Sequence, residues 1–244
     1  MGDGKVIAFI PARGGSKGIK LKNVIKFNGR PLIHWILDAL YNSKEIDIVY
    51  VATDDLRIEC SVENFKDKIR NKEKIQIYHR DSKNAKDKSS TEDVMIEFIK
   101  NPSIKLDKND IFMLVQCTNP FLTTEYVDGA IEDYRNKLEI NNEYSILSVV
   151  EYDRFLWRKD NTINRCSPVN YDSFNRKRRQ DLNDFDKLYL ENGSFYLSTV
   201  SNIMLYGNRL TNNVGFYIMP KHTYLEIDEP IDLKIGEIIC QQKL

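Results

Sequence analysis

The segment with the clearest chemistry is a glycine-rich loop at residues 11–18, which reads PARGGSKG. Glycines let the backbone approach a ligand closely, so consecutive N–H groups can surround an anion. Arg13 and Lys17 would add charged hydrogen bonds to phosphate oxygens. The segment could instead be a flexible turn that merely exposes two basic residues. An apolar run at residues 6–10 leads directly into it, and this order favours a loop that binds the phosphates of a nucleotide.

A second candidate is the acidic segment at residues 225–233, LEIDEPIDL. Glu226 and Asp228 are two residues apart, so in extended backbone their carboxylates lie on the same side. Two such carboxylates near a phosphate loop suit the oxygen coordination of Mg²⁺. The alternative is a solvated acidic turn before a helix, in which Asp232 or Glu229 favours the helix start. Because the sequence also contains the glycine-rich loop, a metal site competes with the interpretation as an acidic turn.

Other polar residues give weaker signals. Arg80 follows an apolar run and could contact a base or a phosphate, whereas Ser89 and Ser90 read on their own as the cap of a helix. The glycine-rich loop has neither the Walker A spacing nor the glycine order of dinucleotide-binding loops, and no nucleophile elbow occurs. The 4 cysteines form no closely spaced pair that would indicate a zinc site or a redox motif.

The composition limits the classes of protein to consider. Of the 244 residues, 36 are Lys or Arg and 36 are Asp or Glu, so the formal net charge is zero. A neutral chain has no global field that draws it to nucleic acid or to a membrane, and the basic block at residues 176–179 occurs without an RNA-binding motif. No apolar run approaches the ~18 residues that a membrane span needs. We therefore expect a globular, cytoplasmic protein with neither nucleic acid nor membrane as a partner.

Strand and helix patterns alternate along the chain, which predicts an α/β fold with a mostly parallel sheet. Apolar runs rich in β-branched residues predict strands at residues 6–10, 46–53, 75–78, 110–115, 145–150, 189–197 and 214–219. Helical spacing of apolar residues predicts helices at residues 31–40, 90–99, 126–134 and 232–240. In such sheets the ligand lies beyond the carboxyl ends of the strands. Polar residues follow three of these ends, at residues 13–17, 54–55 and 116–119, and we expect them to meet there.

Residues 152–187 differ from the rest of the chain because they are polar and weakly periodic. They nevertheless retain aromatic residues for burial: Phe155, Trp157, Tyr171, Phe174 and Phe185. We interpret residues 152–187 as an inserted lobe in a domain formed by residues 1–151 and 188–244. Such a lobe commonly packs against a neighbouring subunit.

Taken together, the motifs resemble those of the acylneuraminate cytidylyltransferases, also called CMP-sialic acid synthetases. Residues 7–24 read IAFIPARGGSKGIKLKNV and are similar to the opening of that family. Further matches follow in order: FNGRPLI at 27–33, VATD at 51–54, HRD at 79–81, LVQCTNP at 114–120, ENGSFY at 191–196 and EID at 226–228. The resemblance therefore covers nearly the whole chain.

This resemblance implies a Rossmann-like nucleotidyltransferase fold, CTP as the donor, Mg²⁺, and a 2-keto sugar acid as the acceptor. The family is commonly a homodimer, with a swapped lobe that corresponds to residues 152–187. Arg13 and Lys17 would hold the CTP phosphates and act in catalysis. The other implied nucleotide contacts are Ala12, Gly14, Asn23, Arg80 and Ser89 or Ser90.

The remaining matches imply contacts with the acceptor and the metal. Gln116 and Asn192 would face the acceptor sugar, and Glu226 and Asp228 would hold Mg²⁺. The implied function is activation of sialic acid or a related nonulosonate with CTP, which yields the CMP-sugar and pyrophosphate.

The chain departs from the family pattern near the implied acceptor site. Leu122 and Leu190 stand where the family has arginines, Cys117 replaces a proline, and Asn119 replaces a serine. Glu226 replaces an aspartate, so its carboxylate reaches one methylene further. Loss of two arginines would weaken recognition of an acidic sugar. Three alternatives therefore stay open: a deoxy-diamino nonulosonate as acceptor, a sister nucleotidyltransferase with another NTP or sugar, and a catalytically silent nucleotide-binding subunit.

Overall fold

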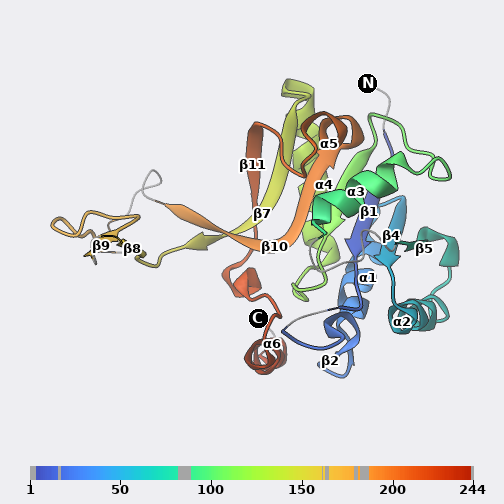
Figure 1. Cartoon of the computed structure of the whole chain (residues 1–244), viewed down its shortest axis with the longest axis horizontal. Coiled ribbons are helices and arrows are strands. Elements are labelled where there is room, and N and C mark those ends of the chain that lie inside the picture. Colours follow the sequence, from blue (N-terminus) through green and yellow to red (C-terminus); the bar gives the residue numbers. More distant parts are fainter. Residues whose placement is uncertain are drawn as a thin grey trace.

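The chain folds around a seven-stranded sheet with helices on both faces (Figure 1). The computed structural model describes residues 4–15, 18–81, 89–160, 162, 165–178, 181 and 187–242. The strands lie in the order β11-β7-β10-β6-β1-β4-β5. Their bounds are β1 Val6–Pro11, β4 Ile48–Thr53, β5 Ile75–His79, β6 Ile111–Val115, β7 Tyr144–Tyr152, β10 Leu188–Thr199 and β11 Asn213–Ile218. All seven predicted strands are therefore present, with ends that differ by a few residues.

Most neighbouring strands of the sheet are parallel. Strand β1 pairs in parallel with β4 and β6, β4 with β5, and β7 with β11. Only β10 runs antiparallel to its neighbours β6 and β7. Its register against β7 shifts between Glu191 and Tyr196, which marks a bulge. The prediction of an α/β fold with a mostly parallel sheet is confirmed.

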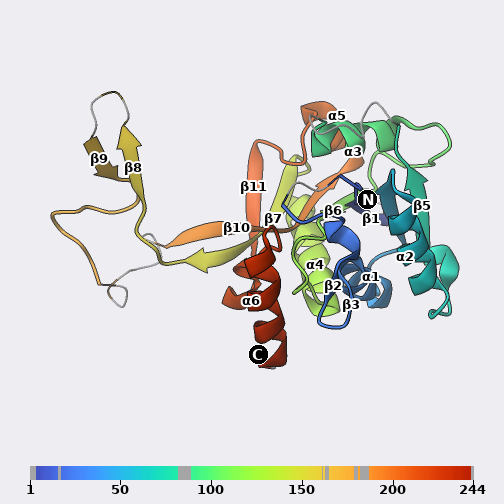
Figure 2. The ribbon, with the colours of Figure 1, turned by 60° about the horizontal axis from the view of Figure 1, so that its bottom comes forward.

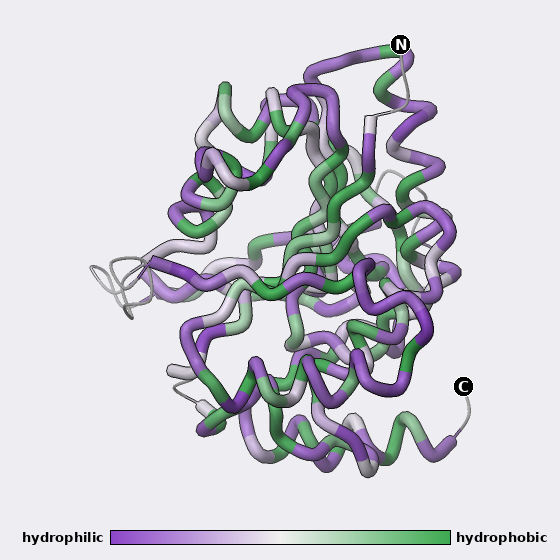
Figure 3. Tube along the Cα trace, turned by 90° about the vertical axis from the view of Figure 1, so that its right-hand side faces the viewer, coloured by the Kyte–Doolittle hydropathy of each residue, from purple (hydrophilic) through white to green (hydrophobic). Residues whose placement is uncertain are grey.

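Two helical layers cover the sheet because its strands are apolar on both faces. Helices α1 (Leu32–Asn42), α2 (Leu56–Lys66) and α4 (Thr124–Ile140) pack on one face. Helices α3 (Thr91–Lys100) and α5 (Val200–Tyr206) pack on the other. Within β1, side chains alternate between the two cores: Ala8 and Ile10 face the first and Ile7 and Phe9 the second. Figure 3 shows these hydrophobic residues gathered along the central strands.

A third, smaller core holds the acidic segment near the glycine-rich loop. Helix α6 (Pro230–Gln241) contributes Leu233 and Ile239, which pack against Phe27, Leu225 and Ile227. The short 3₁₀ turns η1 (Lys22–Val24) and η5 (Lys221–Tyr224) lead directly into Ile25 and Leu225, which pack in this core. The hairpin of β2 (Lys26–Phe27) and β3 (Arg30–Pro31) contributes Phe27. The chain that follows β1 and the chain that precedes α6 are thereby packed together.

An arm extends from the sheet where β7 and β10 run on beyond it. At its end β8 (Trp157–Asp160) and β9 (Arg165–Pro168) form a hairpin that stands away from the other elements in both Figure 1 and Figure 2. Phe155 packs against Tyr171 with ring centroids 4.4 Å apart and ring planes tilted by 46°. Trp157 is 55% exposed and Phe174 is fully exposed, so the expectation that these two rings are buried is wrong for a single chain. Phe185 lies outside the described residues.

The four predicted helices correspond to α1, α3, α4 and α6, whereas α2 and α5 were not predicted. The pattern for α2 is present in the sequence, because Ile58, Val62 and Phe65 recur at helical spacing and all three are buried. The other residues of α2 are mostly polar, so the apolar stripe that these three side chains form is easily missed. Among the described residues, no helix is both long and apolar enough to cross a membrane.

Candidate active site

A cavity of about 410 Å³ opens at the carboxyl ends of β1, β5 and β6. Of the three polar groups that were expected to meet, those that follow β1 and β6 line this cavity, whereas residues 54–55 after β4 do not. Residues from distant parts of the sequence form its walls. The lining residues are Pro11, Arg13, Gly18, Lys22, Asn23, Arg80, Ser89, Ser90, Thr91, Val94, Gln116, Cys117, Thr118 and Asp228. The volume and the polar lining suit a charged small molecule.

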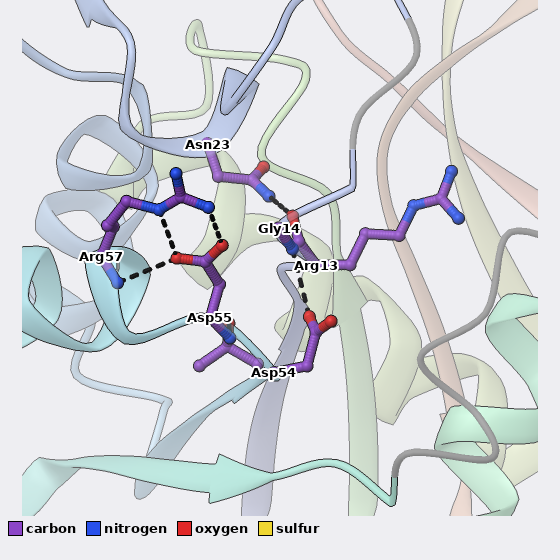
Figure 4. Close-up of polar contacts among 7 residues, drawn as sticks. Arg13, Gly14, Asn23, Asp54, Asp55 and Arg57 are labelled. Carbon is purple, nitrogen blue, oxygen red and sulfur yellow. Dashed lines mark hydrogen bonds and ion pairs between the residues drawn. The ribbon is translucent and has the colours of Figure 1, made fainter.

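Three hydrogen bonds fix the glycine-rich loop, two of them to the end of β4 and one from Asn23 of η1. The Ala12 N–H donates to the carbonyl oxygen of Ala52 at 2.8 Å, and the Gly14 N–H donates to Asp54 Oδ1 at 3.1 Å. The Asn23 side-chain amide donates to the Arg13 carbonyl oxygen at 3.0 Å (Figure 4). The loop is thus held through its backbone, and in Figure 4 the Arg13 side chain points away from Asn23 and Asp54. Lys17, the other predicted catalytic residue, lies outside the described residues.

Two guanidinium groups contribute positive charge to the cavity. The Arg80 backbone N–H donates to the Thr53 carbonyl oxygen at 3.1 Å, which fixes Arg80 beside the loop. Burial lowers the pKa of the Arg80 guanidinium, and the charge of Arg13 acts in the same direction, while Asp54 opposes both. Because Arg13 and Arg80 both line the cavity, their charges would stabilise an anion bound there.

The first turn of α3 forms another wall of the cavity. Ser90 is its N-cap: the Ser90 hydroxyl accepts from the Asp93 N–H at 3.0 Å, and Asp93 Oδ2 accepts from the Ser90 N–H at 2.9 Å. The interpretation of these serines as a helix cap is therefore confirmed for Ser90. Ser89, Ser90 and Thr91 also line the cavity, so the same residues start the helix and face the space in which a ligand would lie.

The acidic segment runs along the cavity wall in extended form. The Ile227 N–H donates to the Thr118 carbonyl oxygen at 2.7 Å and the Ile227 side chain is fully buried. Glu226 and Asp228 therefore lie on the opposite side from Ile227, as their spacing predicts. The Thr118 hydroxyl donates to Glu226 Oε2 at 3.3 Å, and Lys22 Nζ lies 2.5 Å from Asp228 Oδ1. Asp228 lines the cavity, whereas Glu226 is not among its lining residues.

Close approach of the glycine-rich loop and the acidic segment depends on Gly18. A Cβ at Gly18 would lie 2.2 Å from the Asp228 carbonyl oxygen, which is well inside van der Waals contact. Gly193, in the bulge of β10, has a φ of +60°, and a Cβ there would lie 2.4 Å from Glu226 Oε2. Glycine at these two positions lets three separate chain segments meet around Glu226 and Asp228.

The two carboxylates have the chemistry of a cation site. Burial raises the pKa of the Glu226 carboxyl, and the neighbouring Asp228 charge raises it further, against the smaller effects of Thr118 and Lys22. A cation between the two carboxylates would relieve this repulsion. Within the described part of the chain, no group of three His, Cys, Asp or Glu side chains could hold a metal ion. Glu226 and Asp228 could supply two oxygen ligands to a cation such as Mg²⁺.

The sequence of the chain matches a known protein family. The family model described as cytidylyltransferase matches residues 7–243 of the chain. The chain belongs to the cytidylyltransferase family. The resemblance seen in the sequence motifs is confirmed.

Individual relatives of this family differ in length and in name. The chain is 35% identical over 238 residues to the N-acylneuraminate cytidylyltransferase of Oncorhynchus mykiss, a match that covers 95% of this chain and 49% of that protein. It is 27% identical over 244 residues to the pseudaminic acid cytidylyltransferase of Campylobacter jejuni, with 96% of each chain covered. The chain thus spans about half the length of the first relative and nearly all of the second.

A solved structure shares the fold. This is the complex of CMP:2-keto-3-deoxy-manno-octonic acid synthetase with CTP, which is similar to this chain with a TM-score of 0.68 and 16% identity, over 98% of this chain and 100% of that one. At this level of identity the likeness supports the nucleotidyltransferase fold.

The structure brings most of the predicted site residues together, but Glu226 and Asn192 do not line the cavity. Arg13, Asn23, Arg80, Gln116 and Asp228 line the cavity with the serines of α3, and Ala12 and Gly14 belong to the adjoining loop. Asn192 does not reach the cavity. It is fully buried, and its amide donates to the Thr223 hydroxyl at 3.0 Å and to the Thr223 carbonyl oxygen at 3.3 Å. Contact of Asn192 with a substrate stays a prediction, and the visible role is to fix the bulge of β10 against η5.

Several lining residues were not among the predicted site residues, and these include Lys22, Thr118 and Val94. Lys22 lies within the motif at residues 7–24, but its partner Asp228 is 206 residues away, so the sequence gives no signal for the pair. Of the two positions where arginines are lost, Leu122 is buried in the core beneath α1 and α4 and does not line the cavity, and Leu190 lies on the arm. The positive charge on the described walls of the cavity comes instead from Arg13, Lys22 and Arg80.

Proposed function

We propose that this chain transfers CMP from CTP to the anomeric hydroxyl of a 2-keto sugar acid and releases pyrophosphate. The observation that carries the proposal is the convergence of the glycine-rich loop, Arg80, the first turn of α3 and Asp228 on one cavity of about 410 Å³. Membership of the cytidylyltransferase family supports CTP as the donor.

In the proposed reaction the acceptor hydroxyl oxygen forms a bond to the α-phosphorus of CTP. The bond from that phosphorus to the oxygen bridging to the β-phosphate breaks, and its electron pair leaves with pyrophosphate. The hydroxyl proton is released, and we assign no residue as its acceptor. Charge builds up on the phosphate oxygens during this step, so the protein acts mainly by positioning and by charge neutralisation. Arg13 would stabilise the charge at the α-phosphate, and Lys17 would stabilise the departing pyrophosphate.

We infer that the metal of the reaction is Mg²⁺, held by Asp228 and Glu226. Bound there, Mg²⁺ would polarise the phosphate and lower the pKa of the attacking hydroxyl. Lys22 Nζ, 2.5 Å from Asp228 Oδ1, orients that carboxylate on the cavity wall.

We propose a nonulosonate as the acceptor. The relatives from Oncorhynchus mykiss and Campylobacter jejuni are named for N-acylneuraminate and for pseudaminic acid, which are both acids of this class. Gln116 lines the cavity, and Glu191 and Asn192 lie in the adjacent bulge of β10, so this side of the cavity is where we expect the acceptor.

Pyrophosphate release tests the proposal directly. The protein is mixed with Mg²⁺, each of the four NTPs and a panel of 2-keto sugar acids that includes N-acetylneuraminate and pseudaminic acid. We expect release with CTP and one acid. Release with UTP or GTP instead would favour a sister nucleotidyltransferase, and CTP binding without release from any acid would favour a silent nucleotide-binding subunit.

We also propose that the protein is a homodimer that associates through the lobe at residues 152–187. The exposed Trp157 and Phe174 support this, because large apolar rings that are exposed on a projecting segment commonly mark an interface. Light scattering after gel filtration gives the mass. We expect that of a dimer, and a shift towards the monomer after Trp157→Ser.

A further inference from the structure

A partly buried ion pair joins the first turn of α3 to the chain between α5 and β11. Arg209 Nε donates to Glu92 Oε1 at 2.6 Å, and the two side chains are 19% and 21% exposed. Burial alone would raise the pKa of the Glu92 carboxyl, but the hydrogen bond and charge of Arg209 lower it overall. Because an ion pair that is largely withdrawn from water is costly to break, Glu92 is held firmly by Arg209.

Arg209 also contacts Tyr196 of β10, the strand on the side of the cavity where the acceptor is expected. Its guanidinium carbon lies 4.8 Å from the centroid of the Tyr196 ring, which is 4% exposed. The Tyr196 hydroxyl in turn donates to the Glu191 carboxylate. A continuous series of contacts thus runs from Glu92 through Arg209 and Tyr196 to Glu191.

The two ends of this series lie next to the two sides of the cavity. Glu92 follows Ser90 and Thr91, which line the cavity on the side expected to hold the nucleoside. Glu191 and Tyr196 bound the bulge of β10, which meets the Gln116 wall because the Gln116 N–H donates to the Ser194 carbonyl oxygen at 3.1 Å. Arg209 is therefore connected to both walls, although it does not line the cavity itself.

We propose that Arg209 is a positioning residue, which holds the α3 wall and the β10 bulge at the spacing that aligns the two substrates. This inference rests on the proposed function, since alignment has meaning only for a two-substrate reaction. The capping box of Ser90 and Asp93 does not involve Arg209, so loss of Arg209 should release the first turn of α3 without unwinding it. The binding of CTP, which is expected to depend mainly on the glycine-rich loop and Arg80, should change little.

The expected signature is a loss of turnover with CTP affinity retained. A displacement of roughly 1 Å between reacting groups can cost ~10²-fold in rate. For Arg209→Met we expect kcat to fall by about tenfold or more, with the Kd for CTP, measured by calorimetry, changed by less than about threefold. Arg209→Lys keeps the charge and should recover part of the lost kcat.

Arg30→Met is the matched control. Like Arg209, Arg30 pairs with a carboxylate, that of Asp38 at 2.9 Å, and lies over an aromatic ring, that of Trp35 at 3.7 Å. Unlike Arg209, it has no contact with the α3 wall among the described residues, and it does not line the cavity. We expect its kcat to equal that of the wild type. If Arg209→Met fails to fold, Glu92→Gln tests the same connection and should show the same separation of kcat from CTP affinity.

Retention of the wild-type kcat by folded Arg209→Met, or an equal loss in Arg30→Met, would overturn the positioning role. A wild-type protein that releases no pyrophosphate would refute the proposed function instead. In that case amide hydrogen exchange tests the positioning role. We expect the first turn of α3 to exchange faster in Arg209→Met than in Arg30→Met. Equal exchange in the two variants would overturn the positioning role.

Discussion

The position of the glycine-rich loop against β4 can be tested with a single methyl group at Gly14. A Cβ at Gly14 would lie 2.2 Å from Asp55 Oδ2 and 2.8 Å from the Asp55 Cβ and Cγ atoms. Carbon and oxygen atoms in ordinary contact are ~3.5 Å apart, so the loop of Gly14→Ala must move by roughly 1 Å. Asp55 cannot easily yield, because Arg57 Nε donates to its Oδ1 at 2.9 Å and the Arg57 N–H does so at the same distance (Figure 4).

The expected effect of Gly14→Ala is large on turnover and small on stability. A shift of roughly 1 Å in a loop that carries Arg13 should lower kcat by ~10²-fold. Overpacking in a partly exposed loop should lower the free energy of unfolding by only ~1 kcal/mol. Pyrophosphate release measures the first quantity and urea unfolding the second. Gly29→Ala is the control, since its φ of +83° makes alanine unfavourable by ~1 kcal/mol while nothing lies within 4 Å of its Cβ. Its turnover should be unchanged.

A second substitution should reverse the effect if the contact with Asp55 causes it. Asp55→Gly removes all three clashing atoms, and glycine replaces an N-cap aspartate at a cost of only a few tenths of a kcal/mol. The double variant Gly14→Ala/Asp55→Gly should regain most of the lost kcat. Wild-type turnover in Gly14→Ala, or a double variant as slow as the single one, would refute this account of the loop.

Three further predictions concern single residues around the site. Arg13→Ala should lower kcat by ~10²-fold or more, as loss of a charged donor to the developing phosphate charge does, and unchanged turnover would contradict the assigned role. Burial raises the pKa of the Cys117 thiol to about 12; at pH 8 Cys117 should therefore resist alkylation in the folded protein while the exposed Cys60 reacts, and equal labelling by mass spectrometry would disprove this. The hydrogen bond from Arg57 holds the pKa of Asp55 below its usual value. Asp55 thus stabilises the fold above pH ~4, and this stabilisation is lost as pH falls through the lowered pKa. Asp55→Ala should lower the free energy of unfolding by ~1 kcal/mol at pH 7 and by less at pH 3, and an equal loss at both would contradict it.

The sheet and most of its helices could be predicted because their residues repeat a local pattern. The apolar run before the glycine-rich loop is β1, and the Ser90 cap starts α3 where the sequence indicates. Helix α5 was missed because its 7 residues are too few to show a helical period. The exposure of Trp157 and Phe174 could not be read from the sequence, since composition shows that a ring is apolar but not whether the same chain covers it.

Part of the site could be predicted for the same local reason, and part could not. Glu226 and Asp228 lie on one side because alternation in extended backbone is a local property. Lys22 and Arg209 depend on partners that are 206 and 117 residues away in sequence, and only the folded sheet brings them together. Asn192 belongs to a matched motif, yet its amide is taken up by Thr223, which no spacing rule indicates.

The most direct test of the proposed chemistry is the fate of the α-phosphate of CTP. The protein is incubated with Mg²⁺, CTP labelled at the α-phosphorus and one nonulosonate at a time, and the products are separated. We predict that label moves into a CMP-sugar in equal amount to the pyrophosphate released, and that UTP and GTP give neither product. Label that stays in CTP with every acid, or that moves from another nucleotide but not from CTP, would contradict the proposed cytidylyl transfer.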